Sequence, residues 1–252
     1  MSADSLAVIA SVSRAQRDVL GVVGSVGEIG VHHGRSFVAL ALSADLGREK
    51  LWACDVFERQ DLNEDSSGLG DRGLFASNLA AVGISLVDDV TVFDESSLTI
   101  PEGFLADACL ARFRFFSVDG GHTHSITLSD LHVAAGALAP GGVVALDDVL
   151  NPGWPGVKSA LDALLAEKPE PRLVVFATNH KAFLCAPSDH ARLLSVTRNA
   201  FVAAGLDRLL ELDHVLHGAR WPALRIKTPW DEPIATFEAM IREAWDMPEH
   251  TS

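Results

Sequence analysis

The fold is decided at Glu28–Ser36, which reads EIGVHHGRS. This stretch follows a short apolar run over Val23–Ile29 and precedes a helical pattern over Phe37–Leu46. Glycine lacks a Cβ and can adopt positive φ, so a glycine-rich turn lets the backbone approach a ligand closely. The free amide groups of the helix that follows would point toward such a ligand. We therefore predict a ligand-binding turn between a strand and a helix, with an ordinary glycine-rich turn as the alternative.

Apolar runs and helical patterns alternate on both sides of this turn. Further strands are predicted at Leu51–Val56, Val90–Phe93, Phe113–Val118, Val143–Leu146, Leu173–Ala177 and Ala182–Cys185. Further helices are predicted at residues 1–20, Leu74–Val82, Ile100–Leu110, Ile126–Leu138 and Gly156–Leu165. This alternation predicts an α/β fold with a doubly wound, mostly parallel, seven-stranded sheet and helices on both faces. Ligands bind such sheets at the carboxyl ends of the strands.

Two regions depart from this alternation. Residues 59–73 are polar and glycine-rich, which favours a lid or binding loop, with a solvated surface loop as the alternative. Residues 189–252 follow the domain over 1–188 and are predicted to form a helical C-terminal extension around Gly218–Pro229. Apolar positions in this extension, Leu210, Val215 and Trp221, could serve a homodimer interface or close the core of one subunit.

Charge and cysteine content restrict the partners. The formal net charge is −14, and an acidic surface repels nucleic acid and anionic membranes. We expect neither as a partner and favour a small molecule. The three cysteines, Cys54, Cys109 and Cys185, lack the spacing of a disulfide framework or a zinc site, which favours a cytoplasmic location. We also expect no signal peptide and no membrane span, because the sequence shows neither pattern.

Asp55 lies at the end of the next predicted strand, one βαβ step after the turn. An acidic side chain there can accept hydrogen bonds from both ribose hydroxyls of a bound nucleotide. With Asp55, the stretch Glu28–Ser36 resembles motif I of the class I S-adenosylmethionine-dependent methyltransferases. The resemblance implies a Rossmann-like fold and S-adenosylmethionine as the cofactor.

The same resemblance implies a division of the cofactor site. Gly30 and Gly34 would line the methionine part of the cofactor, and Glu28 and Ser36 would fix its polar ends. Ser96 would lie near the adenine. Asp119, at the end of a later strand, would also contact the cofactor.

Three carboxylates follow two later strands. Asp119 comes directly after Phe113–Val118, and Asp147 and Asp148 come directly after Val143–Leu146. Neighbouring strands lie about 4.8 Å apart, so these carboxylates would crowd one volume. Such crowding is costly unless a proton or a cation offsets the repulsion. An all-oxygen cluster suits a hard divalent ion, most simply Mg²⁺, and the alternative is that one aspartate caps a helix and another faces solvent.

His122 lies three residues after Asp119, beside the predicted metal site. An imidazole titrates near neutrality, so it can take a proton from an acceptor hydroxyl. His124 is the fallback for this role. For either histidine the alternative is a packed or solvated position.

Three segments carry a more specific resemblance. Asp119–His122, the Pro140–Gly142 turn and Asp147–Val157 are similar to the metal-dependent sugar O-methyltransferases of the macrocin and mycinamicin type. The resemblance covers roughly residues 20–165. It implies that Asp119, Asp147 and Asp148 hold Mg²⁺ and that His122 is the base. The chain departs from the wider group at Gly121, where a second aspartate is frequent, and this leaves the ligand set open.

We therefore expect Mg²⁺-dependent methyl transfer from S-adenosylmethionine to a hydroxyl of a small-molecule or oligosaccharide acceptor, favouring a sugar or glycoside. Trp154 could stack on a sugar face or be buried in the core, and Asn151 and His124 are further candidate acceptor contacts. Alanine and arginine outweigh lysine, which suggests an actinobacterial setting. A mannoside in a methylated polysaccharide is then a specific case.

Three alternatives stay open. A catechol-type O-methyltransferase acting on an aromatic diol would use the same carboxylates. A non-catalytic scaffold would keep the fold without the cofactor, although Glu28, Gly30, Gly34 and Asp55 are all present. A nicotinamide-dependent dehydrogenase needs a different glycine spacing and ranks last.

Overall fold

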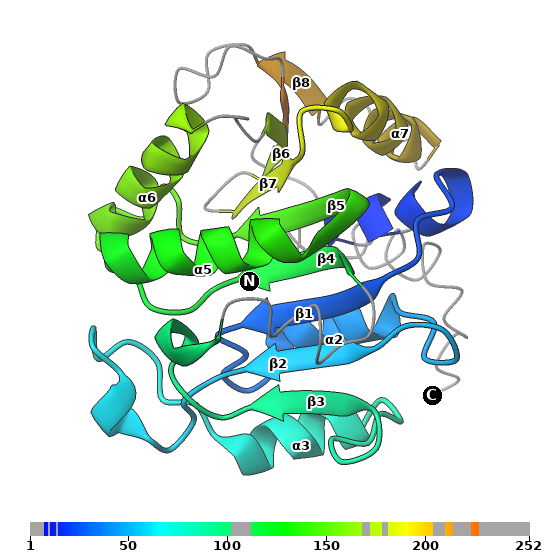
Figure 1. Cartoon of the computed structure of the whole chain (residues 1–252). Helices are drawn as coiled ribbons and strands as arrows, with labels where there is room; N and C mark the ends of the chain where they lie inside the picture. The colour runs from blue at the N-terminus through cyan, green and yellow to red at the C-terminus, as the bar shows by residue number, and fades with distance from the viewer. Residues whose placement is uncertain are drawn as a thin grey trace, which may run out of the picture.

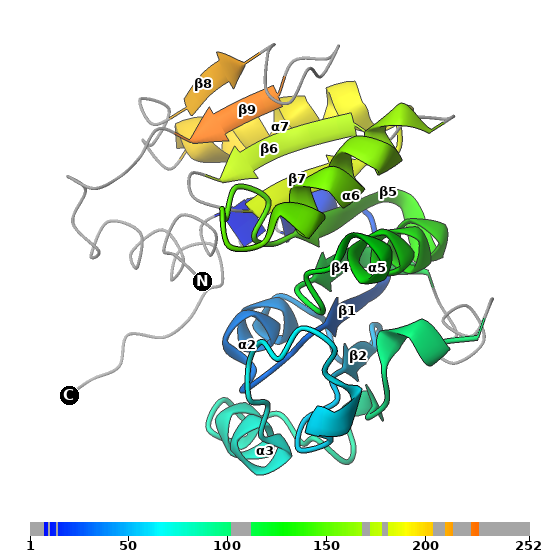
Figure 2. The ribbon, with the colours of Figure 1, turned by 90° about the vertical axis from the view of Figure 1, so that its left-hand side faces the viewer.

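The computed structural model describes residues 8–9, 11–13, 15–101, 112–167, 172–177, 181–203, 210–213 and 223–226. Within these residues, nine strands form one sheet. In chain order they are β1 (Ser25–Ile29), β2 (Leu51–Cys54), β3 (Val90–Phe93), β4 (Phe113–Val118), β5 (Leu138–Leu146), β6 (Arg172–Ala177), β7 (Lys181–Cys185), β8 (Leu210–Asp213) and β9 (Ala223–Ile226). Their order across the sheet is β3-β2-β1-β4-β5-β7-β6-β9-β8 (Figure 1, with β9 labelled in Figure 2).

Helices cover both faces of this sheet. They are α2 (Arg35–Leu42), α3 (Arg72–Ala80), α5 (His124–Ala137), α6 (Pro155–Ala166) and α7 (His190–Ala203), with short helical turns η1 (Ala15–Val19), η2 (Gln60–Leu62) and η3 (Ser97–Thr99). Helices α5 and α6 pack together on one face, whereas α2 and α3 lie on the other (Figure 2). The predicted doubly wound α/β fold is therefore confirmed.

The central strands are buried on both faces. In β5, Val143 and Ala145 join the core beneath α2 and α7, whereas Val144 and Leu146 join the core beneath α5 and α6. Successive strand residues point to opposite faces, so a strand covered on both sides needs apolar residues at every position. This explains why the last four residues of β5 form an unbroken apolar run, whereas β1 and β4 also bury polar residues such as Glu28 and Arg114.

The strand order reverses beside β1. Strands β1 to β5 pair in parallel, and the chain first moves outward from β1 through β2 to β3. It then returns to β4 on the other side of β1 and continues to β5. A doubly wound sheet binds ligands at such a switch point, beyond the carboxyl ends of the strands. The turn after β1 and Asp119 after β4 lie at this position.

The C-terminal extension differs from the prediction. Its first helix, α7, is present, but Leu210–Asp213 and Ala223–Ile226 form strands β8 and β9, so a purely helical extension is wrong and the sheet exceeds seven strands. Strand β9 pairs in parallel with β6, and β8 pairs antiparallel with β9. This pairing covers an edge of β6 that would otherwise expose unpaired backbone groups. The alternation of Leu210, Glu211, Leu212 and Asp213 was the available signal.

Some predictions fall on residues that the structure does not describe. These are the first residues of the helix over 1–20, nearly all of the helix over Ile100–Leu110, and the interface positions Val215 and Trp221. The homodimer therefore stays a prediction. In the part of the chain that is described, none of the helices has the length and apolar character needed to cross a bilayer.

A buried ion pair ties β4 to the segment before β2. Arg114 Nε lies 2.7 Å from Glu49 Oε1, and Arg114 Nη2 donates to Glu49 Oε2 at 3.1 Å. Both side chains are almost fully buried, at 0% and 2% exposure. Arg114 Nη2 also donates to the backbone oxygen of Ser43. Removing one partner would leave an uncompensated charge inside the protein.

We expect Glu49→Gln to lower the free energy of unfolding by about 3–5 kcal/mol, the usual cost of breaking a buried pair. The matched control is Asp162→Asn, which breaks the exposed Lys158–Asp162 pair and should cost at most about 1 kcal/mol. Urea denaturation at pH 7 measures both. Equal losses in the two variants would contradict this account.

The same pair should make stability depend on pH. Burial opposes ionisation of Glu49, but hydrogen bonds from Arg114 outweigh it and hold the pKa of this carboxyl below its usual value. A carboxyl with a lowered pKa in the folded state adds stability above its unfolded pKa and loses it as pH falls through the folded pKa. The wild type should therefore lose more stability than Glu49→Gln between neutral and acidic pH.

Candidate active site

The turn between β1 and α2 brings the backbone into the switch point. Gly30 has φ +83° and Gly34 has φ +87°, conformations that favour glycine. A Cβ on Gly30 would lie 1.9 Å from the backbone oxygen of Asp119, so only glycine lets β1 approach the end of β4 this closely. Helix α2 begins after Gly34 without a side-chain cap, which leaves its first amide groups available to a ligand.

A pocket of about 910 Å³ opens at this point. Its walls come from the turn after β1, the ends of β2 and β4, the segment 60–70 and the residues just after β3. Among the residues predicted to bind the cofactor, six line it: Gly30, Gly34, Ser36, Asp55, Ser96 and Asp119. The structure therefore gathers residues that are far apart in the sequence around one cavity.

Glu28 lies beneath this pocket rather than in its wall. It is fully buried in β1, and Ser36 Oγ donates to its Oε1 at 2.6 Å. Burial raises the pKa of Glu28 to about 7, with the charge of Lys181 opposing that rise. Glu28 and Ser36 thus form a buried pair that joins β1 to the first turn of α2.

Asp55 lies at the end of β2 and faces the pocket. Its Oδ2 accepts the backbone N–H of His32 at 2.7 Å, and its Oδ1 accepts the N–H of Phe57 at 2.7 Å. His32 adopts φ +51°, an uncommon conformation for a residue with a side chain. A Cβ on Gly70 would lie 2.6 Å from Asp55 Oδ1, so the segment 59–71 passes directly over this carboxylate.

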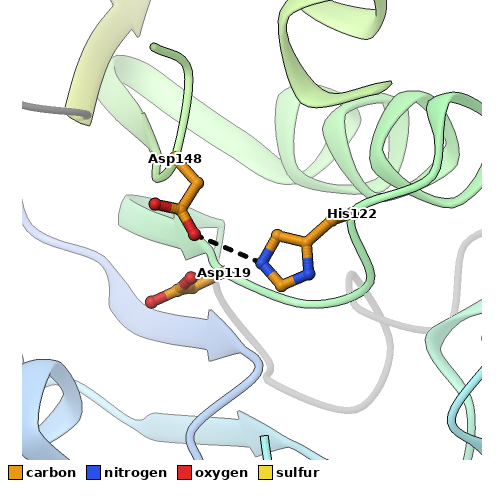
Figure 3. Close-up of side chains that lie close together, drawn as sticks. All are labelled: Asp119, His122 and Asp148. Carbon is orange, nitrogen blue, oxygen red and sulfur yellow. Dashed lines mark ion pairs between the residues drawn. The ribbon is translucent and has the colours of Figure 1, made fainter. Parts of the chain in front are cut away.

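Two aspartates and a histidine meet beside the pocket. Asp119, His122 and Asp148 each present one ligand atom, and these atoms lie within 4.8 Å of one another (Figure 3). His122 Nε2 is 3.4 Å from Asp148 Oδ2. Asp148 adopts φ +57°, and backbone strain of this kind is often retained at functional sites. The two carboxylates offer the oxygen ligands that suit a divalent cation, and the imidazole lies beside them.

Asp147 is placed differently from the other two aspartates. Its Oδ2 lies 2.9 Å from Nζ of Lys181, whose side chain is 1% exposed. Strand β7 runs antiparallel to β5, with Ala182 opposite Leu146, so the first residue of β7 reaches the edge where β5 ends. Sequence reasoning missed Lys181, because the rule about carboxyl ends of strands does not cover an antiparallel neighbour.

The charges of Asp119, Asp147 and Lys181 depend on one another. Burial raises the pKa of Asp119 well above its usual range, and the charges of Asp147 and Glu28 raise it further, whereas Lys181 opposes the rise. Burial also favours a higher pKa for Asp147. The ammonium of Lys181 outweighs this effect, so the pKa of Asp147 is lowered. Lys181 therefore compensates part of the negative charge of these carboxylates, in addition to any proton or metal ion.

His122 is held in place by contacts with Asp65 and Trp154. Asp65 Oδ2 lies 2.9 Å from its Nδ1 and accepts its backbone N–H at 2.5 Å. Trp154 stacks on the imidazole with a centroid distance of 4.4 Å and an interplanar angle of 18°. Burial alone would lower the pKa of His122, but the neighbouring carboxylates of Asp148 and Asp65 raise it. Sequence reasoning did not identify Asp65.

The remaining predicted acceptor contacts lie around this group. Asn151 Nδ2 donates to Asp148 Oδ1 at 3.2 Å, and Trp154 covers His122 as described. His124 is the first residue of α5, is exposed, and pairs with Ser159 Oγ of α6 at 2.8 Å. His124 therefore makes its described side-chain contact with α6, whereas Asn151 and Trp154 hold members of the Asp119–His122–Asp148 group.

Known proteins share this architecture. Residues 28–149 match a family described as methyltransferase domain. The chain is similar in structure to CalS11, a TDP-rhamnose 3'-O-methyltransferase of calicheamicin biosynthesis, with 20% identity, a TM-score of 0.51, and coverage of 70% of this chain and 77% of that one. It is also similar to the O-methyltransferase TomG from Streptomyces achromogenes in complex with SAM, with 21% identity, a TM-score of 0.53, and coverage of 74% and 81%. No curated protein matches the chain.

At these identities the solved structures establish the shared fold, and function has to be argued from the site. The family match covers the segment that contains the glycine turn, Asp55 and the three aspartates. The prediction of a class I methyltransferase is thereby confirmed. The sheet of the chain has the class I methyltransferase fold, and residues 28–149 carry its match to the methyltransferase domain family.

Proposed function

We propose that this protein transfers a methyl group from S-adenosylmethionine to a hydroxyl oxygen of a small acceptor, a sugar or glycoside, with the help of a divalent cation, most simply Mg²⁺. One observation carries the proposal: Asp119 and His122 line the same pocket as the cofactor turn. A base and a candidate cation site thus lie next to the place where the methyl donor would bind.

The reaction is an in-line displacement that needs positioning and a proton acceptor. The new O–CH₃ bond forms as the S–CH₃ bond breaks, and the reacting atoms must approach within about 3–3.5 Å. The acceptor proton goes to Nε2 of His122, which faces the carboxylates. A cation held by Asp119 and Asp148 would stabilise the negative charge that develops on the acceptor oxygen. Asp147, paired with Lys181, would lie next to the cation site and add to its negative charge.

The cofactor roles follow the pocket walls. Asp55 is proposed to accept the ribose hydroxyls, and Gly30 and Gly34 would leave room for the methionine part. Ser96 would lie near the adenine. Glu28 and Ser36 would fix the polar end of the methionine part from beneath the turn.

The sugar acceptor is supported by the sequence resemblance at Asp119–His122 and Asp147–Val157. CalS11, which shares the fold, acts on TDP-rhamnose. The described pocket wall also includes polar side chains of the segment 60–70, namely Gln60, Asn63, Glu64 and Ser67, which could bind hydroxyl groups.

A screen of glycosides and diols with a methyl-labelled donor tests the proposal. We expect label in a glycoside product. Labelling of catechols alone would reverse the choice of acceptor. Calorimetry with S-adenosylhomocysteine provides the independent control, since absence of binding would favour a scaffold.

Removal of the cation should slow the reaction strongly. A bound cation supplies several kcal/mol of charge stabilisation, so EDTA treatment should lower the rate by roughly 100-fold. Added Mg²⁺ should restore the rate. Binding of Mn²⁺, followed by electron paramagnetic resonance, should weaken in Asp148→Asn and not in the exposed-surface variant Asp162→Asn. Turnover that survives thorough chelation would remove the metal from the mechanism.

A further inference from the structure

Asp65 joins the segment between β2 and α3 to His122, which lies 57 positions later in the sequence. One carboxylate oxygen, Oδ2, contacts both the backbone N–H and Nδ1 of His122. The other oxygen, Oδ1, accepts the backbone N–H of Ser67 at 3.0 Å and its hydroxyl at 2.6 Å. The side chain of Asp65 is only 7% exposed. Oδ2 therefore contacts His122 directly, whereas Oδ1 binds Ser67, whose hydroxyl oxygen lies 3.1 Å from Nδ1 of the same imidazole.

We propose that Asp65 is a positioning residue for methyl transfer, which holds His122 in the tautomer whose Nε2 is free to accept a proton. The inference rests on the proposed function for its catalytic consequence, but not for the geometry. With Asp65 Oδ2 accepting from Nδ1–H, the lone pair of the neutral imidazole is on Nε2. Nε2 is the nitrogen that faces Asp148, at 3.4 Å.

The ionisation state of Asp65 agrees with this role. Burial opposes its charge, but hydrogen bonds from Ser67 and His122 lower its pKa to about 2. At neutral pH the carboxylate is therefore ionised, so it can accept hydrogen bonds but cannot donate one. A carboxylate on the far side of an imidazole fixes the ring and its tautomer, which is the task of the aspartate in hydrolase triads.

The segment that carries Asp65 also closes over the cofactor pocket. Gly70 lies against Asp55, and the backbone oxygen of Leu69 contacts Nε2 of His33 at 3.1 Å. Ser67 and Gly68 line the pocket. In the segment 59–71, Gly70 thus contacts Asp55, the proposed ribose-binding residue, and Asp65 contacts His122, the proposed base. This placement makes the predicted binding loop a part of the reacting site rather than a solvated surface loop.

The substitution Asp65→Asn leaves one acceptor oxygen where the carboxylate has two. This oxygen can face either Ser67 or His122, and the side-chain NH₂ group then meets backbone N–H donors on the other side. If the NH₂ group faces His122, Nδ1 must become the acceptor, which places the proton on Nε2 and removes the base. We expect Asp65→Asn to lower kcat about 10- to 100-fold, as is usual for groups that orient an essential histidine, with a smaller change in KM for the methyl donor.

The experiment combines a matched control with a double-mutant cycle. The control is Asp61→Asn, an exposed aspartate in the same segment. If Asp65 acts through His122, adding Asp65→Asn to His122→Ala should lower kcat no further. Full additivity of the two losses, or an equal loss in Asp61→Asn, would overturn the proposal.

A spectroscopic readout keeps the geometry testable without turnover. In protein labelled with ¹⁵N-histidine, the His122 signals at neutral pH should show a protonated Nδ1 in the wild type and in Asp61→Asn, and a changed tautomer in Asp65→Asn. An unchanged tautomer in Asp65→Asn would refute the positioning role. If the wild type shows the expected tautomer but methylates no hydroxyl compound, the proposed function fails while the arrangement of Asp65 and His122 stands.

Discussion

His122→Ala should lower kcat by about 10²–10⁴-fold, the range that a positioned general base contributes. The imidazole presents Nε2 to the carboxylates, and no other described imidazole belongs to this group. S-adenosylhomocysteine should still bind, because the glycine turn and Asp55 are untouched. Single-turnover methyl transfer, together with calorimetry of the bound product cofactor, separates the two effects.

His132→Ala provides the matched control. His132 lies on α5 and pairs with Glu167 at the surface, with 49% of its side chain exposed. This variant should keep wild-type kcat. If His122→Ala binds the cofactor and keeps full activity, His122 is not the base.

Gly30→Ala should abolish cofactor binding. The added Cβ would lie 1.9 Å from the backbone oxygen of Asp119, so either β1 or the end of β4 must move. The contact involves backbone on both sides and cannot be relieved by a side-chain rotation. Displacing Asp119 would disturb the cation site as well, so the variant should lose both S-adenosylhomocysteine binding and Mn²⁺ binding.

Gly83→Ala separates the clash from backbone strain. Gly83 has φ +80°, almost the value of Gly30, but a Cβ there meets no atom within 4 Å. Alanine in this conformation should cost about 1–2 kcal/mol of stability and leave ligand binding intact. Cofactor binding by a folded Gly30→Ala protein, at wild-type affinity, would show that close approach of β1 and β4 is not needed.

The sequence predicts the central fold because its signals there are local. Short, mostly apolar runs mark strands covered on both faces, and the glycine pattern after β1 marks the turn. The predicted strand at Val90–Phe93 coincides with β3, and Phe113–Val118 coincides with β4. The ends of these strands then locate Asp55 and Asp119 at the switch point without any tertiary information.

Asp65 and Lys181 could not be found in the same way. Asp65 is one of several acids in a polar segment, and nothing in its immediate sequence distinguishes it from Asp61. Only the path of the loop over the pocket brings it to His122. Lys181 begins a strand instead of following one, so its place depends on the direction of β7, which an apolar run does not encode.

The position of Lys181 has a consequence for synthesis of the protein. Glu28, Asp119 and Asp147 leave the ribosome before the lysine that compensates them, and chains begin to fold from the N-terminal side. Buried without a partner, these carboxyls would have to stay hydrated or carry protons. The first five strands can therefore collapse early, but their carboxylates gain the compensating ammonium only when β7 inserts beside β5. The nascent chain thus carries an unfinished active site until its C-terminal half has emerged.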